Sequence, residues 1–75
     1  MRSPLEKNIL KRFGNKVRKE RLRIGISQEE LAARAGVHRT YIGMVERAEK
    51  NITLKNIDKI CEALNLSISD FFSDF

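Results

Sequence analysis

Side chains that can hydrogen-bond to the edges of base pairs gather at residues 38–47. Arg39 carries a planar guanidinium whose donors match the O6 and N7 acceptors of guanine, a contact worth about 1–3 kcal/mol of discrimination. Thr40 can hydrogen-bond a base or place its methyl group against thymine. Arg39, Gly43 and Arg47 are spaced by four residues, so they would share one face of a helix. These residue types favour recognition of nucleic acid.

The sequence offers little from which to build a catalytic or metal site. The single His38 and the single Cys61 cannot form a zinc cluster, and one cysteine cannot form an internal disulfide. We see no paired carboxylates and no nucleophile with a neighbouring base at catalytic spacing. We therefore expect no enzyme activity, no cofactor, no metal and no small-molecule ligand, and we expect Cys61 to be an inert core residue.

Charge is distributed unevenly along the 75 residues, whose net charge is +5. Residues 1–25 hold nine Lys and Arg against two Glu, whereas residues 56–75 hold one Lys against four Asp and Glu. One end should therefore face an anion, of which nucleic acid is the commonest and an acidic membrane surface the second. On charge alone, a solvated basic helix fits as well. No apolar run is long enough for a membrane span or a secretory signal, so we expect a cytoplasmic protein.

Capping signals and periodicity predict an all-α fold, a compact bundle of five helices. Residues 3–6 form a capping box with Pro4 at the first helical position, and Gly25 ends the helix that follows. A stripe recurs every four residues along this helix: Leu5, Ile9, Phe13, Val17 and Arg21. Because Gly14 weakens the middle of the helix, we divide the chain into an N-terminal helical extension, 1–12, and a domain with a C-terminal dimerisation helix, 13–75.

Four shorter helices are expected after Gly25. Residues 27–30 form a second capping box that opens a helix ending at Ala35, and a third helix covers about 38–48. Thr53 is a good N-cap for the fourth helix, and Ser69 can start the last. The fourth helix has an expected inward face of Leu54, Ile57, Ile60, Cys61 and Leu64.

The second and third helices must cross at a steep angle, because only residues 35–37 join them. Gly36 can adopt the left-handed conformation that this turn needs, and Ala32 is small enough for a close approach. This is the spacing of a helix-turn-helix, whose second helix enters the DNA major groove. An ordinary helical hairpin would use the same packing, but the charge asymmetry favours DNA binding.

Two stretches carry a family resemblance that covers about residues 13–72. Residues 26–47 read ISQEELAARAGVHRTYIGMVER, which resembles the helix-turn-helix of the Cro/C1-type, or XRE, family. Residues 49–72 read EKNITLKNIDKICEALNLSISDFF, which is similar to the last two helices of that family. The combination VHRTYI, VER and KNIT resembles the restriction–modification controller proteins. The resemblance implies a short, free-standing bacterial dimer that regulates its own operon and an endonuclease gene.

The resemblance also implies which residues contact DNA. It assigns base reading to the start of the third helix and the next turn: His38, Arg39, Thr40, Gly43 and Met44. Free N–H groups at the start of the second helix favour a phosphate beside Ser27 and Gln28. Further phosphate contacts are expected from Tyr41, Arg47, Lys50, Asn51 and Thr53. Thr53 serves equally well as a cap alone, Tyr41 as a packing residue, and Gly43 as a tolerant position or a point where the backbone approaches DNA.

Arg21 continues the apolar stripe of the first helix, so its charge should be partly buried and must be paired. Glu46 projects near the inward side of the third helix and is the expected partner. The resemblance implies the same ion pair, which would orient the third helix against the first.

The aromatic end of the chain suggests a homodimer. Phe71, Phe72 and Phe75, together with Leu66 and Ile68, offer more apolar surface than one short helix can bury. A two-fold axis would place two recognition helices on a palindromic site in double-stranded DNA. The alternative is that Phe71 or Phe72 completes the core of the monomer.

Two functions remain open at this point. The first is a sequence-specific transcriptional regulator that represses by blocking a promoter or activates by touching RNA polymerase through an acidic residue such as Glu49. The second is an antitoxin or similar interaction module, which binds DNA and uses its aromatic end to hold a partner protein.

Overall fold

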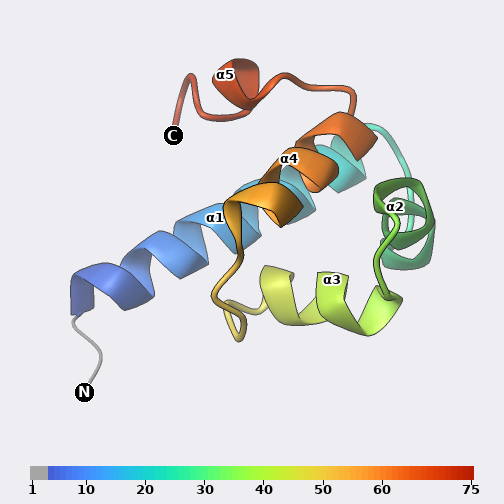
Figure 1. The fold of residues 1–75 in the computed structure, drawn as a ribbon. Helices are drawn as coiled ribbons and strands as arrows, with labels where there is room; N and C mark the ends of the chain where they lie inside the picture. Colours follow the sequence, from blue (N-terminus) through green and yellow to red (C-terminus); the bar gives the residue numbers. More distant parts are fainter. Residues whose placement is uncertain (1–3) are drawn as a thin grey trace.

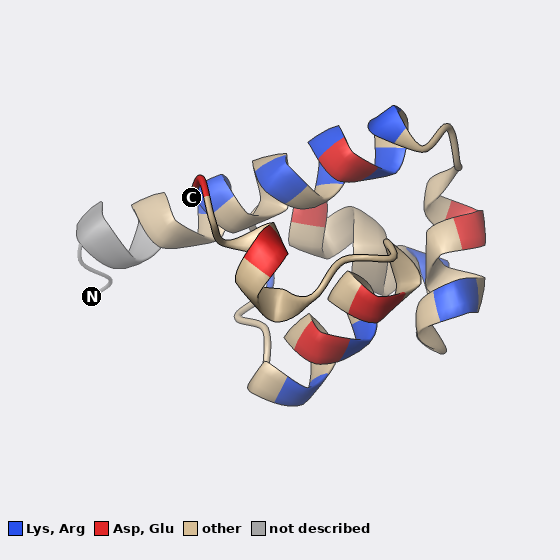
Figure 2. Ribbon diagram, turned by 90° about the horizontal axis from the view of Figure 1, so that it is seen from above, with Lys and Arg blue, Asp and Glu red and all other residues tan. Residues whose placement is uncertain are grey.

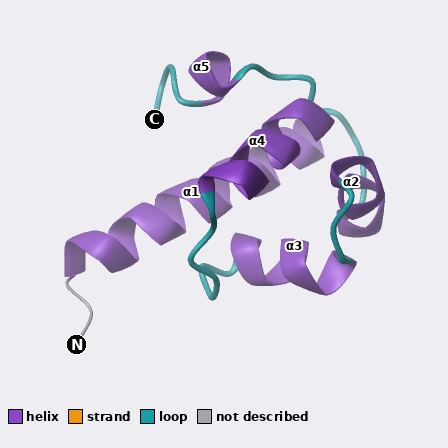
Figure 3. Cartoon of the chain, in the orientation of Figure 1, coloured by secondary structure: helices purple, strands orange, loops and turns teal. Residues whose placement is uncertain are grey.

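The computed structural model describes residues 4–75, with side chains from residue 8 onward. This part of the chain folds into helices joined by short loops, without a strand (Figure 3). The helices are α1 (Pro4–Arg23), α2 (Gln28–Ala35), α3 (Arg39–Glu46), α4 (Leu54–Ala63) and α5 (Ile68–Phe71). The predicted all-α fold with five helices is confirmed. Ser3 and the side chains of Leu5 and Glu6, which we expected to cap and begin α1, lie outside the described residues.

The long helix α1 forms the back of the molecule in the view of Figure 1, and α4 lies in front of its C-terminal half. Helix α3 packs against α1 and α2, while α4 packs against α2 and α5. Side chains from all five helices meet in one core, whose largest fully buried members are Phe71, Leu31, Ile42, Ile60, Leu64, Val17 and Val45. Cys61 belongs to this core, as predicted, and burial raises the pKa of its thiol to about 11. None of the described helices combines the length and apolarity needed to cross a membrane.

Side-chain caps set the helix boundaries. The hydroxyl of Thr53 accepts a hydrogen bond from the Asn56 N–H at 3.2 Å, as expected for the N-cap of α4. Helix α5 begins earlier than predicted, because Ser67 rather than Ser69 is its N-cap and accepts from the Asp70 N–H at 2.9 Å. Helix α3 is shorter than the predicted 38–48, since Ala48 has a φ of +61°, which a helix cannot include.

Two apolar residues that we expected to face inward are exposed. Ile9 belongs to a strict four-residue stripe, and each four-residue step overshoots a helical turn of 3.6 residues by about 40°. The stripe therefore rotates out of the core, and Leu10 is buried in place of Ile9. Leu54 is 75% exposed because it is the first residue of α4 and the helix reaches the core only after it.

The acidic end of the chain folds back onto the basic helix α1. Lys16 Nζ lies 2.6 Å from Asp74 Oδ1, and this hydrogen bond lowers the pKa of the Asp74 carboxyl below its ordinary value of 3.8. The guanidinium of Arg12 lies over the Phe75 ring, 4.4 Å from its centre. Figure 2 shows the Lys and Arg positions that repeat along α1 and the acidic position beside the C-terminus. The basic and acidic ends of the sequence are therefore in contact in the folded chain, and their charges partly neutralise each other.

Gly14 lies where α1 meets the end of α3, and α1 continues through it without a break. A Cβ at this position would fall against the carbonyl oxygens of Val45 and Glu46, 2.9 Å from the latter. These are backbone atoms, which cannot move aside as the end of a side chain can. Gly14 therefore allows two helices to approach closely, and the division of the chain at residue 12 remains a prediction.

We expect Gly14→Ala to lower the free energy of unfolding by about 1–3 kcal/mol, because an added methyl group forces α1 and α3 apart. Urea unfolding followed by circular dichroism measures this change. The control is Asn15→Ala on the exposed face of the same helix, which should be neutral or slightly stabilising. Equal stability of the two variants would show that α3 can shift away from α1 at no cost.

Candidate nucleic-acid interface

The turn between α2 and α3 has the conformation that the sequence predicts. Gly36 has a φ of +70°, in the left-handed region that favours glycine. The next N–H, of Val37, bonds to the Ala32 carbonyl at 3.0 Å, and Ala32 is buried where the two helices meet. The turn changes the direction of the chain between the two helices. One side of α3 remains uncovered beside the start of α2.

A buried ion pair fixes α3 against α1. Arg21 Nε lies 2.7 Å from Glu46 Oε2, and Arg21 Nη2 donates to Glu46 Oε1 at 3.1 Å. The third nitrogen, Nη1, donates to the Ile26 carbonyl at 3.0 Å. The Glu46 side chain is only 2% exposed, so both charges depend on each other for solvation. The predicted Arg21–Glu46 pair is confirmed.

Gln28 extends this network to α2. Its amide nitrogen donates to Glu46 Oε1 at 3.0 Å, so one carboxylate is bound by side chains from α1 and α2. We predicted Gln28 as a phosphate contact from its place at the start of α2, and the structure adds this second role. Helices α1, α2 and α3 are therefore held in one orientation by a single carboxylate.

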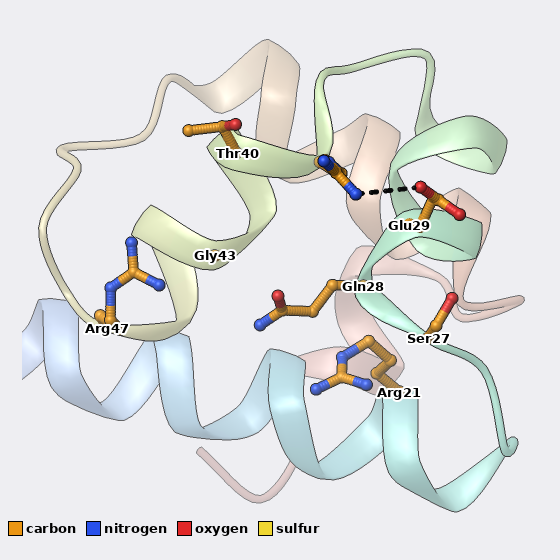
Figure 4. Close-up of a pocket in the computed structure, with 8 residues that line it drawn as sticks. Arg21, Ser27, Gln28, Glu29, Thr40, Gly43 and Arg47 are labelled. Atoms are coloured by element: carbon orange, nitrogen blue, oxygen red, sulfur yellow. Dashed lines mark hydrogen bonds and ion pairs between the residues drawn. The ribbon is translucent and has the colours of Figure 1, made fainter.

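A groove of about 550 Å³ lies over this network, between the start of α2 and α3 (Figure 4). It brings together predicted base-reading and phosphate-binding residues with two residues that we did not expect to contact it directly. The lining residues are Arg21, Ser27, Gln28, Glu29, Arg39, Thr40, Gly43 and Arg47. Three guanidiniums line it, and each is paired with a carboxylate: Arg21 with the buried Glu46, Arg39 with Glu29, and Arg47 with Glu49. The pairs of Arg39 and Arg47 are exposed, so these two cations can exchange their partners for an anion.

Arg39 and Thr40 occupy the first turn of α3, and both are exposed. Arg39 Nη1 lies 3.3 Å from Glu29 Oε2, with 68% of the Arg39 side chain exposed to solvent. A pair this exposed is worth at most about 1 kcal/mol, so Arg39 can exchange Glu29 for a base at little cost. Sequence reasoning missed Glu29, because its contact with Arg39 spans ten residues and two helices.

The other predicted base-reading residues differ in their surroundings. His38 is the N-cap of α3, and its Nδ1 accepts from the Thr40 N–H at 3.2 Å, which leaves Nε2 as the ring nitrogen for a contact with a base. Met44 is half-buried. Gly43 is buried, because the guanidinium of Arg47 covers it, and an approach of its backbone to DNA stays a prediction.

The predicted phosphate-binding residues lie in more than one place. Ser27 and Arg47 line the groove with Gln28, whereas Asn51 lines a separate apolar cavity. The Tyr41 hydroxyl accepts from Asn56 Nδ2 at 3.0 Å, which leaves its own hydrogen available for a phosphate oxygen. Lys50 and Thr53 are exposed, and Thr53 is also the cap of α4.

The separate cavity has about 190 Å³ and lies between α1, the loop before α4 and the aromatic end of the chain. Its lining is Ile9, Leu10, Phe13, Asn51, Ile52, Ile57, Phe72 and Phe75. Phe71 has no exposed surface and packs on Phe13, so its predicted place in a dimer interface is wrong. It completes the core of the monomer, the alternative left open for Phe71 or Phe72. Phe72, Phe75 and Leu66 are half-buried, and Ile68 is exposed.

We expect Glu46→Gln to destabilise the protein by about 3–5 kcal/mol, because it leaves the buried Arg21 charge without a partner. Glu30→Gln is a matched control: it removes an ion pair of the same type, with Arg34 Nε at 3.0 Å, from the exposed surface. That control should cost less than about 1 kcal/mol. Chemical denaturation measures both, and similar losses would mean that burial adds nothing to the Arg21–Glu46 pair.

Comparison with known proteins places this geometry in a family. The sequence model described as helix-turn-helix matches residues 17–71. Control protein C.BamHI of Bacillus amyloliquefaciens is 47% identical over 64 residues, which are 84% of this chain and 79% of the relative. Control protein C.MunI of a Mycoplasma species is 41% identical over 64 residues, 84% of this chain and 86% of the relative.

Solved structures agree with the sequence relatives. The restriction-modification controller protein C.AhdI from Aeromonas hydrophila superposes with a TM-score of 0.84 at 39% identity, covering 88% of this chain and 96% of that one. C.Esp1396I, solved as a tetramer in complex with its natural 35 base-pair operator, superposes with a TM-score of 0.83 at 35% identity, covering 87% and 86%. The chain therefore belongs to the helix-turn-helix family, among the restriction–modification controller proteins.

Proposed function

We propose that this chain is a dimeric regulator of transcription that binds a palindromic operator in double-stranded DNA, in the cytoplasm, and controls its own operon. The observation that carries the proposal is the exposed first turn of α3, with Arg39 and Thr40 facing the groove while the Arg21–Glu46 pair holds the helix. Helix α3 would lie in the major groove, and the start of α2 would meet the phosphate backbone.

A tripeptide supports the assignment of the base-reading turn. Among the solved structures of C.Esp1396I are variants in which an arginine, a threonine and a tyrosine, consecutive in that protein, are replaced. The same three residue types stand here as Arg39, Thr40 and Tyr41. RNA polymerase remains a predicted partner, for which Glu49 is exposed in the loop between α3 and α4 but paired with Arg47 at 3.2 Å.

Self-association would use the apolar face around the 190 Å³ cavity. Leu54 lies one turn before Ile57 on α4, next to the cavity lining, and is the most exposed of the large apolar side chains described. We propose that Leu54, Ile9, Phe72 and Phe75 meet the same residues of a second copy, with Leu66 and Ile68 at the edge. The tetramer of C.Esp1396I on its operator supports the use of such symmetry on DNA.

Arg39→Lys tests base reading, because lysine keeps the charge but lacks the bidentate fork. We expect the affinity for the selected operator to fall about 5- to 150-fold, while binding to random duplex changes little. Fluorescence anisotropy on both duplexes measures this, with the operator obtained by selection from random DNA. Arg34→Lys, at an exposed position of α2 outside the groove, is the matched control and should leave both affinities unchanged. An equal loss on the two duplexes would assign Arg39 to phosphate instead.

Leu54→Glu tests the dimer. The change should leave the monomer folded, since the side chain is exposed, but should place two carboxylates near the two-fold axis. Sedimentation should show monomers, and operator affinity should fall with the loss of the second recognition helix. Leu22→Glu changes the exposed leucine of α1 and should leave the dimer intact. If Leu54→Glu sediments as wild type, the copies associate through another face.

A further inference from the structure

Gly43 is buried although it lies on the face of α3 that borders the groove. The cover is the guanidinium of Arg47, one helical turn further along the chain. Around the position that a Cβ would take at residue 43, Arg47 Nη1 lies at 3.1 Å, and Cζ and Nη2 at 3.7 Å. Figure 4 shows Arg47 and Gly43 together on α3, across the groove from Ser27. The absent side chain thus leaves a seat that the guanidinium fills.

The backbone and Glu49 explain why the Arg47 side chain points back toward Gly43. Arg47 is the C-cap of α3, and side chains on a helix lean toward its N-terminus, which brings position 47 back over position 43. Arg47 Nε lies 3.2 Å from Glu49 Oε2 on the other side. Glu49 therefore occupies one edge of the guanidinium and leaves the Nη1 and Nη2 edge toward Gly43 and the groove.

Gly43 differs from Gly14 in what surrounds it. At Gly14 a Cβ would strike backbone carbonyls, whereas at Gly43 it would meet only the end of one flexible side chain. An alanine at residue 43 would therefore be accommodated by the fold and would favour the helix, since glycine costs about 1 kcal/mol relative to alanine. Folding alone does not account for glycine here, but the position of Arg47 does.

We propose that Gly43 is a positioning residue: it seats the Arg47 guanidinium in the groove so that Arg47 binds one phosphate of the DNA backbone, and it reads no base itself. The proposal rests on the proposed function and refines it. A phosphate is the ligand because Arg47 stands at the far end of α3 from Arg39 and faces Ser27 and Gln28 across the groove. Arginine side chains and the N–H groups at helix starts are both common sources of phosphate contacts in protein–DNA complexes.

The test is a graded pair of variants, Gly43→Ala and Gly43→Leu, measured for the salt dependence of DNA binding. Each phosphate contact contributes about 0.9 to the slope of log K against log salt concentration on B-form DNA. We expect the magnitude of this slope to decrease by about 0.9 in the leucine variant and by less than that in the alanine variant. Affinity should fall equally on operator and random duplex, and thermal stability should not fall in the alanine variant.

An Arg47→Ala background provides the control. Arg47→Ala alone should lower the slope by about 0.9, and adding either change at residue 43 should lower it no further. An unchanged slope in Gly43→Leu, a further loss of slope in the Arg47→Ala background, or a loss confined to the operator would each overturn the proposal. A wild-type protein that binds no duplex would overturn the proposed function as well, so the two failures are distinguishable.

Discussion

The buried carboxylate of Glu46 is the constraint on which the arrangement of the first three helices depends. It binds Arg21 through two nitrogens and Gln28 through a third, and its side chain has almost no contact with water. Burying two charges is costly unless the geometry satisfies both, and here each has several hydrogen bonds. An alternative packing of α3 would leave one of these charges unpaired, so the ion pair selects one orientation of the helix that carries Arg39.

Charge along the sequence indicated the kind of partner better than it indicated where charges lie. The basic count of α1 supported an anionic ligand, but Lys16 is bound to Asp74 and Arg12 lies on Phe75. The acidic tail thus neutralises part of the helix that it covers. The guanidiniums that line the groove come from α1, α3 and the cap of α3, and the turn at Gly36, the close contact at Gly14 and the Arg21–Glu46 pair bring them to one surface.

Local signals in the sequence predicted most of the fold. The caps Thr53 and Ser27 and the turn residue Gly36 act within a few residues of themselves, so their roles can be read without knowing the tertiary structure. Leu54 could not be placed in this way, since a helical stripe does not say where the core ends. The Arg39–Glu29 pair and the choice of Phe71 over Phe72 for the core likewise depend on contacts between separate elements. Arg21–Glu46 was the exception, because a charge within an apolar stripe requires a partner.

Gly14 and Gly43 show why residue type alone was insufficient. Each lies inside a helix, where glycine is unfavourable, but the neighbour of Gly14 is rigid backbone and that of Gly43 is the end of a flexible side chain, the guanidinium of Arg47. The first glycine therefore fixes the distance between α1 and the end of α3, which is a property of the fold. The second is not required for the packing of the helices, but it governs where the guanidinium of Arg47 lies in the groove. Gly14 thus sets how closely α3 packs against α1, and Gly43 sets where the guanidinium of Arg47, the C-cap of α3, lies.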